Sequence, residues 1–343
     1  MRPTLVGPLL SLVVAGSALV PASSGAASDR QALLAEARAA GSHCVAVVRD
    51  GRTVLSKDLD RRVDTSTAWS ITKSVTSLLV GIAQDRGLLR LDDRVSRYVP
   101  EWRRTPSRRV TVRHLLANTS GREWSMETDY TEMTSARNKT RFSVRLSQQA
   151  RPGTEWYYNN SAIQVLEAVL EKATGMPVHE FADRVLLRPL RMRSSSIQRD
   201  PSGNTMLFAG LVTTCPDLAR LGVMLADGGK YQGRRIVSKR YLRQATQRSS
   251  SELNRAYGLL FWINEPGPVL PAVPLPEGTP TPQGPMVPGA PEDAFWAIGL
   301  GQQILHVSPS TGVVAVRLGE PPTEAAPLTV ARFTELATAV ARR

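Results

Sequence analysis

Ser70 and Lys73 form a Ser-x-x-Lys pair at the start of a strongly apolar segment. Residues three apart share one face of a helix, so the lysine amine would lie beside the serine hydroxyl. A helix N-terminus presents free backbone N–H groups and favours negative charge, which an attacking serine oxygen and a tetrahedral oxyanion both carry. If burial lowers the pKa of Lys73, its amine can accept the serine proton. The pair predicts a serine nucleophile with a lysine base, although a lone Ser-x-x-Lys also arises by chance.

Tyr158 and Asn160 form a second polar pair, in a loop just before a predicted helix. A tyrosine beside a protonated lysine can be partly ionised and act as a base, and an asparagine amide can orient a lysine or bind a substrate carbonyl. Isolated loop tyrosines are more often packing residues. From these residues alone, the catalytic and the packing interpretations both stand.

The elements that must position these residues begin with a hairpin, because residues 45–49 and 53–56 flank the turn pair Asp50-Gly51. The helix that starts at Ser70 is predicted to end at Gly87, and its apolar residues recur at helical spacing: Val75, Leu78, Leu79, Ile82 and Ala83. Further helices are predicted over 111–117, 160–173, 178–186, 216–226, after Ser238 and over 328–340. Strands are predicted over 257–263, within 295–307 and over 312–318.

Strands at both ends of the chain therefore bracket a helical middle. We expect an α/β (α+β) fold in which an antiparallel sheet, flanked by helices, carries a mainly helical inserted lobe. The sheet lobe would span about 40–86 and 255–343, and the helical lobe about 87–254. The Pro-rich segment 265–291 is predicted to lack regular structure and to form an exposed loop or a lid near the site. A cleft between the lobes is the expected place for the site.

The N-terminus is typical of a secretory signal peptide over residues 1–27, with Arg2, an apolar run from Leu5 to Val20 and small residues up to Ala27. We expect the remaining 28–343 to be a secreted, extracellular domain. The alternative is a single N-terminal membrane anchor. Cys44 and Cys215 could pair in an oxidising compartment, or they could be two separate buried residues.

The chain is strongly basic, with a net charge of +13 and a pI of about 10.4. Because the charge is spread along the whole chain without interleaved aromatic residues, solvated basic faces are expected rather than a nucleic-acid partner. A cationic secreted protein would also be attracted to an anionic cell surface. The four histidines have no metal spacing and are expected to be structural: His43, His114, His179 and His306. No metal or other cofactor is predicted, and the sequence leaves the oligomeric state open.

Several motifs occur together over most of the chain: 70–77, 91–93, 99–102, 114–121, Pro152-Gly153-Thr154 through Tyr158-x-Asn160, and 210–220. In order and spacing they resemble the serine β-lactamase and penicillin-binding protein superfamily, in its class C-like branch. That branch includes D-alanyl-D-alanine carboxypeptidases, esterases and 6-aminohexanoate-dimer hydrolases. The resemblance implies a β-lactamase/transpeptidase-like fold and a secreted serine hydrolase that acts through an acyl-enzyme on an ester or amide. It assigns Ser70, Lys73 and Tyr158 to catalysis and Asn160 to substrate orientation.

The third motif of that superfamily departs from its usual form. Its best match is Ala297-Ile298-Gly299, where relatives often carry Lys-Thr-Gly or His-x-Gly. Gly299 would let a substrate backbone approach closely, and the Leu300 N–H would join that of Ser70 in an oxyanion hole. Ala297 and Ile298 offer no cation or hydroxyl for a substrate carboxylate, so Arg317 or the Pro-rich loop would have to supply one.

This departure favours an esterase- or amidase-like enzyme for small or peptide-like substrates. The alternatives are a D-alanyl-D-alanine carboxypeptidase or β-lactamase, a non-catalytic penicillin-binding-like ligand sensor, and a cationic wall- or nucleic-acid-binding protein.

Overall fold

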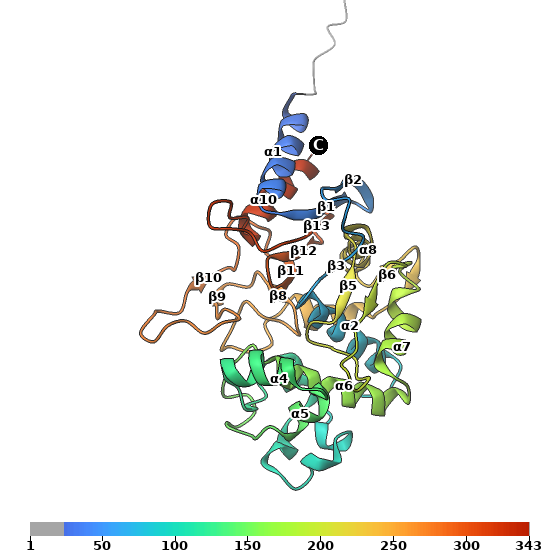
Figure 1. The fold of residues 1–343 in the computed structure, drawn as a ribbon, viewed down its shortest axis with the longest axis vertical. Helices are drawn as coiled ribbons and strands as arrows, with labels where there is room; N and C mark the ends of the chain where they lie inside the picture. The colour runs from blue at the N-terminus through green and yellow to red at the C-terminus, as the bar shows by residue number, and fades with distance from the viewer. Residues whose placement is uncertain (1–23, 343) are drawn as a thin grey trace, which may run out of the picture.

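A six-stranded antiparallel sheet forms the centre of the fold, in the order β2-β1-β13-β12-β11-β8 (Figure 1). The structure is a computed structural model that describes residues 24–342. The strands are β1 (Ser42–Arg49), β2 (Arg52–Asp58), β8 (Trp262–Ile263), β11 (Phe295–Gly299), β12 (Gln303–Ser308) and β13 (Val313–Gly319). Because β1 pairs with β13, both ends of the chain meet in one sheet, and the predicted mixed fold is confirmed.

Two local predictions for the sheet need correction. The strand expected over 257–263 is reduced to β8, and the region 295–307 holds two strands rather than one. A turn over 300–302 separates β11 from β12, with positive φ at Gly301 (73°) and at Gln302 (58°). The predicted hairpin turn is present, because Asp50 and Gly51 both have the positive φ that a tight two-residue hairpin requires.

Helices cover both faces of the sheet. On one face, α1 (Ser24–Ala39) packs against α10 (Val330–Ala341), and the Trp296 indole of β11 donates to Thr334 of α10. On the other face lie α2 (Ile71–Asp85) and α8 (Cys215–Ala226), where Gly222 lies against Leu305 of β12. The sequence places α8 in the helical lobe, but its apolar face packs on the sheet.

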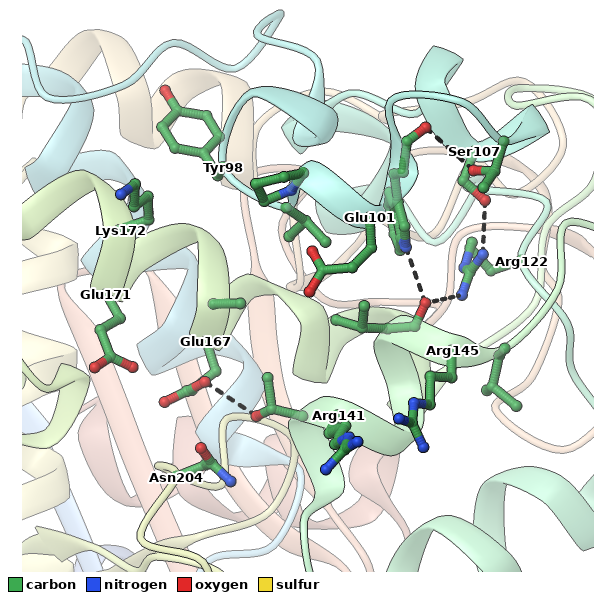
Figure 2. A pocket seen from close by; sticks show the side chains of 18 of the residues that line it. Tyr98, Glu101, Ser107, Arg122, Arg141, Arg145, Glu167, Glu171, Lys172 and Asn204 are labelled. Carbon is green, nitrogen blue, oxygen red and sulfur yellow. Dashed lines mark hydrogen bonds between the residues drawn. The ribbon is translucent and has the colours of Figure 1, made fainter.

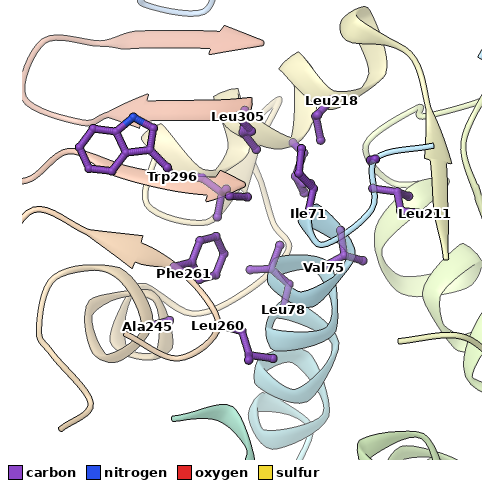
Figure 3. Packing of buried hydrophobic residues seen from close by; sticks show 14 of the residues in the cluster. Ile71, Val75, Leu78, Leu211, Leu218, Ala245, Leu260, Phe261, Trp296 and Leu305 are labelled. Carbon is purple, nitrogen blue, oxygen red and sulfur yellow. The ribbon is translucent and has the colours of Figure 1, made fainter. Parts of the chain in front are cut away.

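Helix α2 is buried along most of its length, which confirms the predicted apolar face. Figure 3 shows Ile71, Val75 and Leu78 among side chains from the sheet and from α8. Burying side chains of this size contributes about 1.5–3 kcal/mol each. Gly81 is needed at the contact with α9 (Lys239–Thr246), because a Cβ there would overlap the Tyr241 ring. This packing holds the residues at the start of α2 rigidly against the sheet.

The mainly helical region contains α3 (Val112–Leu116), α4 (Met133–Ser135), α5 (Lys139–Arg145), α6 (Asn160–Thr174) and α7 (Val178–Ala182), with π-helical turns at Glu127–Glu132 and Asp183–Leu187. Three 3₁₀ turns precede α3, at Val95–Arg97, Pro100–Trp102 and Pro106–Arg109. Helix α6 begins where Asn159 accepts from the Ala162 N–H, and it ends at Gly175, whose φ of 71° only glycine adopts readily.

Short strands complete the structure. β3 (Ser66–Thr67), β5 (Leu211–Thr213) and β4 (Ser196–Ile197) form a small sheet, and β6 (Lys230–Tyr231) pairs with β7 (Arg234–Arg235). The Pro-rich segment was expected to be irregular. It contains one two-residue ribbon, β9 (Gly267–Pro268) with β10 (Gln283–Gly284), and it extends from the side of the fold in Figure 1.

Cys44 of β1 and Cys215 of α8 form a disulfide, which decides between the two alternatives that the sequence left open. It links positions 171 residues apart and ties α8 to the sheet. Most of the predicted signal peptide lies outside the described residues, and the expected cleavage position at Ala27 falls within α1. Within residues 24–342, no helix combines the length and the apolar character needed to cross a bilayer.

Candidate active site

Ser70 is the residue that precedes α2, at the point where the chain leaves the small β3-β5 sheet. Its hydroxyl does not cap the helix but accepts a hydrogen bond from Lys73 Nζ at 2.7 Å. The N–H groups of Ile71, Thr72 and Lys73 donate to the carbonyl oxygens of residues 68–70. The sequence predicts free N–H groups at this helix start, and these three are not free. The residue before the serine, Trp69, has a φ of 48°, a strained value for a large side chain, and strain of this kind is typical of functional sites.

Lys73 is 1 % exposed and forms no ion pair among the described residues. Its Nζ donates to Ser70 and, at 2.8 Å, to the Phe208 carbonyl oxygen. Burial lowers the pKa of Lys73 to about 7, against a smaller opposing effect of the Asp129 charge. A substantial fraction of the amine is therefore neutral near pH 7 and able to accept the serine proton.

Tyr158 lies over the same amine, with Lys73 Nζ 4.7 Å from its ring centroid. Burial raises the pKa of Tyr158, and a hydrogen bond with Ser70 opposes that rise. The phenol therefore keeps its proton at neutral pH, and the alternative in which it is a tyrosinate base does not fit this environment. The ring is held by Trp262, which stacks on it at 5.9 Å, and by the edges of Trp156 and Tyr257.

Asp129 is a second charged group at the site, and no sequence pattern points to it. Its buried carboxylate accepts from the N–H groups of Asn160 and Ser161 and from the Ser161 hydroxyl, at 2.7–2.8 Å. Burial raises the pKa of Asp129, and the three hydrogen bonds and the Lys73 charge offset that rise only in part. Its neighbour Tyr130 hydrogen-bonds the Asn160 side chain, so that amide is engaged by a tyrosine rather than by Lys73.

The end of β11 forms the opposite wall. A Cβ on Gly299 would collide with the carbonyl oxygen of Ala68, so only glycine lets this strand approach the chain before Ser70. Ala297 is buried, Ile298 is half-buried and Leu300 is 67 % exposed. The structure thus brings Gly299, the last residue of the third motif, against the chain just before Ser70. The side chains of 297–299 carry no cation and no hydroxyl.

Arg317 was a sequence candidate for binding a substrate carboxylate, and the structure rules it out. Its guanidinium is fully buried and donates to the carbonyl oxygens of Gly301 and Gln302, at 2.7 and 2.9 Å. Its other donors reach Ser42 Oγ and the carbonyl oxygens of Ala40 and Glu320. All five N–H groups are used, and two of the bonds hold the turn that follows Leu300.

A cavity of about 330 Å³ adjoins Tyr158, and its lining is mostly apolar but includes Glu155, Thr279 and Thr281. Trp156 and Tyr157 line it on one side, and the Pro-rich segment lines it on the other: Leu270, Pro271, Ala272, Pro274, Leu275 and Pro276. The Pro-rich segment therefore lies beside the site. This agrees with one of its two predicted forms, a lid near the site, the other being an exposed loop. Its lining carries no lysine or arginine.

The residues that sequence analysis missed have little sequence signal. Asp129 and Tyr130 lie in a polar stretch without periodicity, and Phe208 contacts Lys73 through its carbonyl oxygen and its ring. Within residues 24–342, no three His, Cys, Asp or Glu side chains are grouped so as to hold a metal ion. The structure gives His114 a local role, because its Nδ1 accepts from the Thr111 N–H at the start of α3.

Comparison with known proteins decides the family. The family model described as Beta-lactamase matches residues 30–333. The chain belongs to this family. Protein flp of Staphylococcus aureus (strain MRSA252) is 27 % identical over 176 residues, which cover 46 % of this chain and 34 % of that protein. Penicillin-binding protein 4* of Bacillus subtilis (strain 168) is 27 % identical over 135 residues, which cover 37 % of this chain and 29 % of that protein. The chain thus matches only about a third of the length of these relatives.

Among solved structures, EstCE1, described as a hydrolase with promiscuous acyltransferase activity, matches with a TM-score of 0.70 and 19 % identity. The match covers 92 % of this chain and 98 % of that one. At this identity it shows the fold alone. The family model therefore gives the family of the chain, and this structural match agrees with it in fold.

Proposed function

We propose that the protein hydrolyses esters or simple amides through an acyl-enzyme, as a class C-like member of its family. The observation that carries the proposal is the 2.7 Å hydrogen bond between Ser70 and a buried Lys73 whose pKa is lowered to about 7. A neutral amine at this distance removes the proton as the serine oxygen attacks the substrate carbonyl carbon. The backbone N–H groups of Ser70 and Leu300 bind the oxyanion that forms.

The remaining steps use the same groups. When the tetrahedral intermediate collapses, the ammonium of Lys73 returns its proton, through the Tyr158 hydroxyl, to the departing alcohol or amine. A water molecule then attacks the acyl carbon and passes its proton through the Tyr158 hydroxyl to Lys73. As the bond between the acyl carbon and Ser70 Oγ breaks, Lys73 returns that proton to Ser70, and the acid product leaves. The role proposed for Asn160, whose side chain hydrogen-bonds Tyr130, is to orient the substrate carbonyl.

The wall of the site favours uncharged substrates. Recognition of a substrate carboxylate relies on charge-assisted bonds, and losing one costs about 1.5–3 kcal/mol, or roughly ten- to a hundredfold in specificity. Ala297 and Ile298 cannot form such a bond, and Arg317 is occupied. The cavity beside Tyr158 has no lysine or arginine in its lining, where Glu155 would repel a carboxylate and Thr279 and Thr281 offer only neutral hydroxyls. Esters and simple amides should therefore be better substrates than penicillins.

The test is kcat/KM for p-nitrophenyl acetate and butyrate, an aminohexanoate dimer, nitrocefin and a D-Ala-D-Ala peptide. We expect one of the esters or the aminohexanoate dimer to have the highest value. A higher kcat/KM for nitrocefin than for every ester and amide would replace the proposal with a β-lactamase. A D-Ala-D-Ala peptide in first place would indicate a carboxypeptidase, which the similarity to Penicillin-binding protein 4* keeps as the second candidate.

Parallel labelling tests the non-catalytic alternative. A fluorophosphonate should add one adduct mass to the protein and none to the Ser70→Ala variant. A ligand sensor without turnover would instead form a stable penicillin adduct and hydrolyse none of the substrates.

We also propose that the protein is exported. The Arg2 and Leu5–Val20 pattern supports this, and a disulfide is typical of an oxidising compartment. Protein recovered from culture fluid should begin near Ala27 or Ser28 on N-terminal sequencing. An intact Met1 chain in the cytosol would contradict export.

A further inference from the structure

A large cavity lies on the helical side of the molecule (Figure 2). Its volume is about 1280 Å³, and none of Ser70, Lys73, Asp129 or Tyr158 lines it. Its walls are the 3₁₀ turns at Pro100–Trp102 and Pro106–Arg109, the helix α5 and the second half of α6. Small-molecule sites usually measure roughly 300–1,000 Å³, so this one has room for an extended ligand.

Charged side chains of both signs line this cavity without pairing. They are Glu101, Arg122, Arg141, Arg145, Glu167, Glu171 and Lys172. None of the ion pairs found among residues 24–342 includes any of them. Figure 2 shows Glu167 and Glu171 toward one end and Arg141, Arg145 and Arg122 toward the other, with Glu101 between them. The two glutamates therefore lie at one end of the cavity, where Lys172 also lies, and the three arginines lie toward the other end.

Two of these groups are buried, which separates this site from an ordinary charged surface. Glu167 is 3 % exposed, its carboxylate accepts from Thr140 Oγ1 at 3.0 Å, and its side chain also hydrogen-bonds that of Glu171. Burial and the neighbouring Glu171 raise the pKa of Glu167 to about 7, as expected for a carboxylate that lacks a cation. A cationic ligand group would satisfy it.

Arg122 is the buried group among the three arginines. It is 4 % exposed and lies over the Trp102 ring at 4.4 Å. Its terminal nitrogens donate to Ser107 Oγ and to the carbonyl oxygens of Ser143 and Val144. Among residues 24–342 its Nε has no partner, and the nearby Glu123 charge acts on it without forming an ion pair. With Arg141 and Arg145, Arg122 maintains a positive potential to which a carboxylate would bind.

We propose that this cavity is a second ligand site that binds a short peptide with free termini. The N-terminal ammonium lies against Glu167 and Glu171, and the C-terminal carboxylate lies against Arg141 and Arg145. Between them, the peptide backbone crosses Trp102 and donates its N–H groups to Glu101. A single amino acid would leave most of the volume empty, whereas a peptide of a few residues has both the length and the separated charges.

The site is separate from the proposed hydrolase activity, since its residues are not part of the Ser70 machinery. Titration calorimetry on the full chain carrying Ser70→Ala, which prevents turnover, tests it with two probes of nearly equal size. Trialanine has both terminal charges, and N-acetyl-trialanine amide has neither. We expect trialanine to bind one-to-one, at least about tenfold more tightly than the blocked peptide, because two charge-assisted contacts are lost in the latter.

Two pairs of substitutions assign the site. Glu167→Gln with Glu171→Gln should weaken trialanine binding roughly 10- to 100-fold, and so should Arg141→Met with Arg145→Met. The arginine pair is exposed, so it tests the proposal even if the glutamate pair fails to fold. The matched control, Glu180→Gln with Arg109→Met, changes exposed residues outside the cavity and should have no effect. Equal affinity for the two peptides, no binding of trialanine, or binding that the arginine pair leaves unchanged would overturn the proposal.

Discussion

The start of α2 and the turn after β11 contribute to the proposed mechanism in different ways. At the start of α2 the proposed groups are side chains, the hydroxyl of Ser70 and the amine of Lys73. In the turn the proposed group is the backbone N–H of Leu300, whose side chain is exposed. The first region is held by the packing of its own helix. The second is held by residues distant in sequence, chiefly Arg317.

The difference explains which substitutions should abolish activity and which should only weaken it. A side chain that reacts has no substitute once it is removed. A backbone donor remains after any substitution, and only its position changes. The expected loss of activity is therefore largest for the reacting groups at α2 and smaller for the groups that position the turn or shift the pKa of the amine.

Ser70→Ala should reduce turnover of the preferred ester by about 10⁴-fold or more, because the nucleophile is lost. The variant should fold normally, since the Ser70 hydroxyl does not cap α2. Steady-state kinetics with circular dichroism as the folding control would test this. Turnover close to the wild-type rate would show that another group is the nucleophile.

Lys73→Arg should be almost inactive, with a loss of at least about 10³-fold, within the range for a proton-transfer group. The guanidinium keeps the positive charge, but it does not lose its proton in a protein, so it cannot accept one from Ser70. The matched control is Lys139→Arg, which alters a buried lysine that donates only to backbone carbonyls of Thr134 and Ala136. Comparable kcat values for the Lys73 and Lys139 variants would remove Lys73 as the base.

Tyr158→Phe should lose at least about 10²-fold in kcat, the lower range for a group that transfers a proton. The ring stays in place among Trp156, Tyr257 and Trp262, so the loss would come from the hydroxyl. Tyr257→Phe removes a hydroxyl from the same aromatic cluster and serves as the control. Wild-type rates in Tyr158→Phe would limit Tyr158 to packing.

Regions held by local packing could be predicted from the sequence, whereas regions held by residues distant in sequence could not. The sheet and α2 follow from apolar periodicity and from the Asp50-Gly51 turn, because both are local signals of burial and chain reversal. Lys73 was predictable because its spacing from Ser70 is a helical one. The placement of Asp129 depends on a π-helical turn with no periodic pattern, and the role of Arg317 depends on the long-range pairing of β13 with β1. Contacts of this kind arise from tertiary packing, so a single sequence does not reveal them.

Arg317→Lys should lower kcat about tenfold and leave KM nearly unchanged. Removing an oxyanion-hole donor outright costs roughly 10²–10³-fold, and a displaced donor should cost less. Lysine keeps the charge but has three donors in place of five, so it cannot hold Ser42, the turn and the carbonyls of Ala40 and Glu320 together. Arg332→Lys, at a surface ion pair with Glu36, controls for the general effect of the substitution. A rise in KM at constant kcat would indicate that Arg317 affects binding rather than the turn.

Asp129→Asn should produce the smallest effect, a shift of the pH profile. In the wild-type enzyme kcat/KM should rise as the pH increases through about 7, because Lys73 becomes neutral above its pKa. The Asp129 charge favours the protonated amine and so raises that pKa. Without it the ammonium is less stable, so the acidic limb should move to lower pH. Ser161→Ala, which removes one hydrogen bond to Asp129 but keeps its charge, should leave the limb close to the wild-type position. A shift of the Asp129→Asn profile to higher pH would show that the carboxylate does not act on Lys73 through its charge.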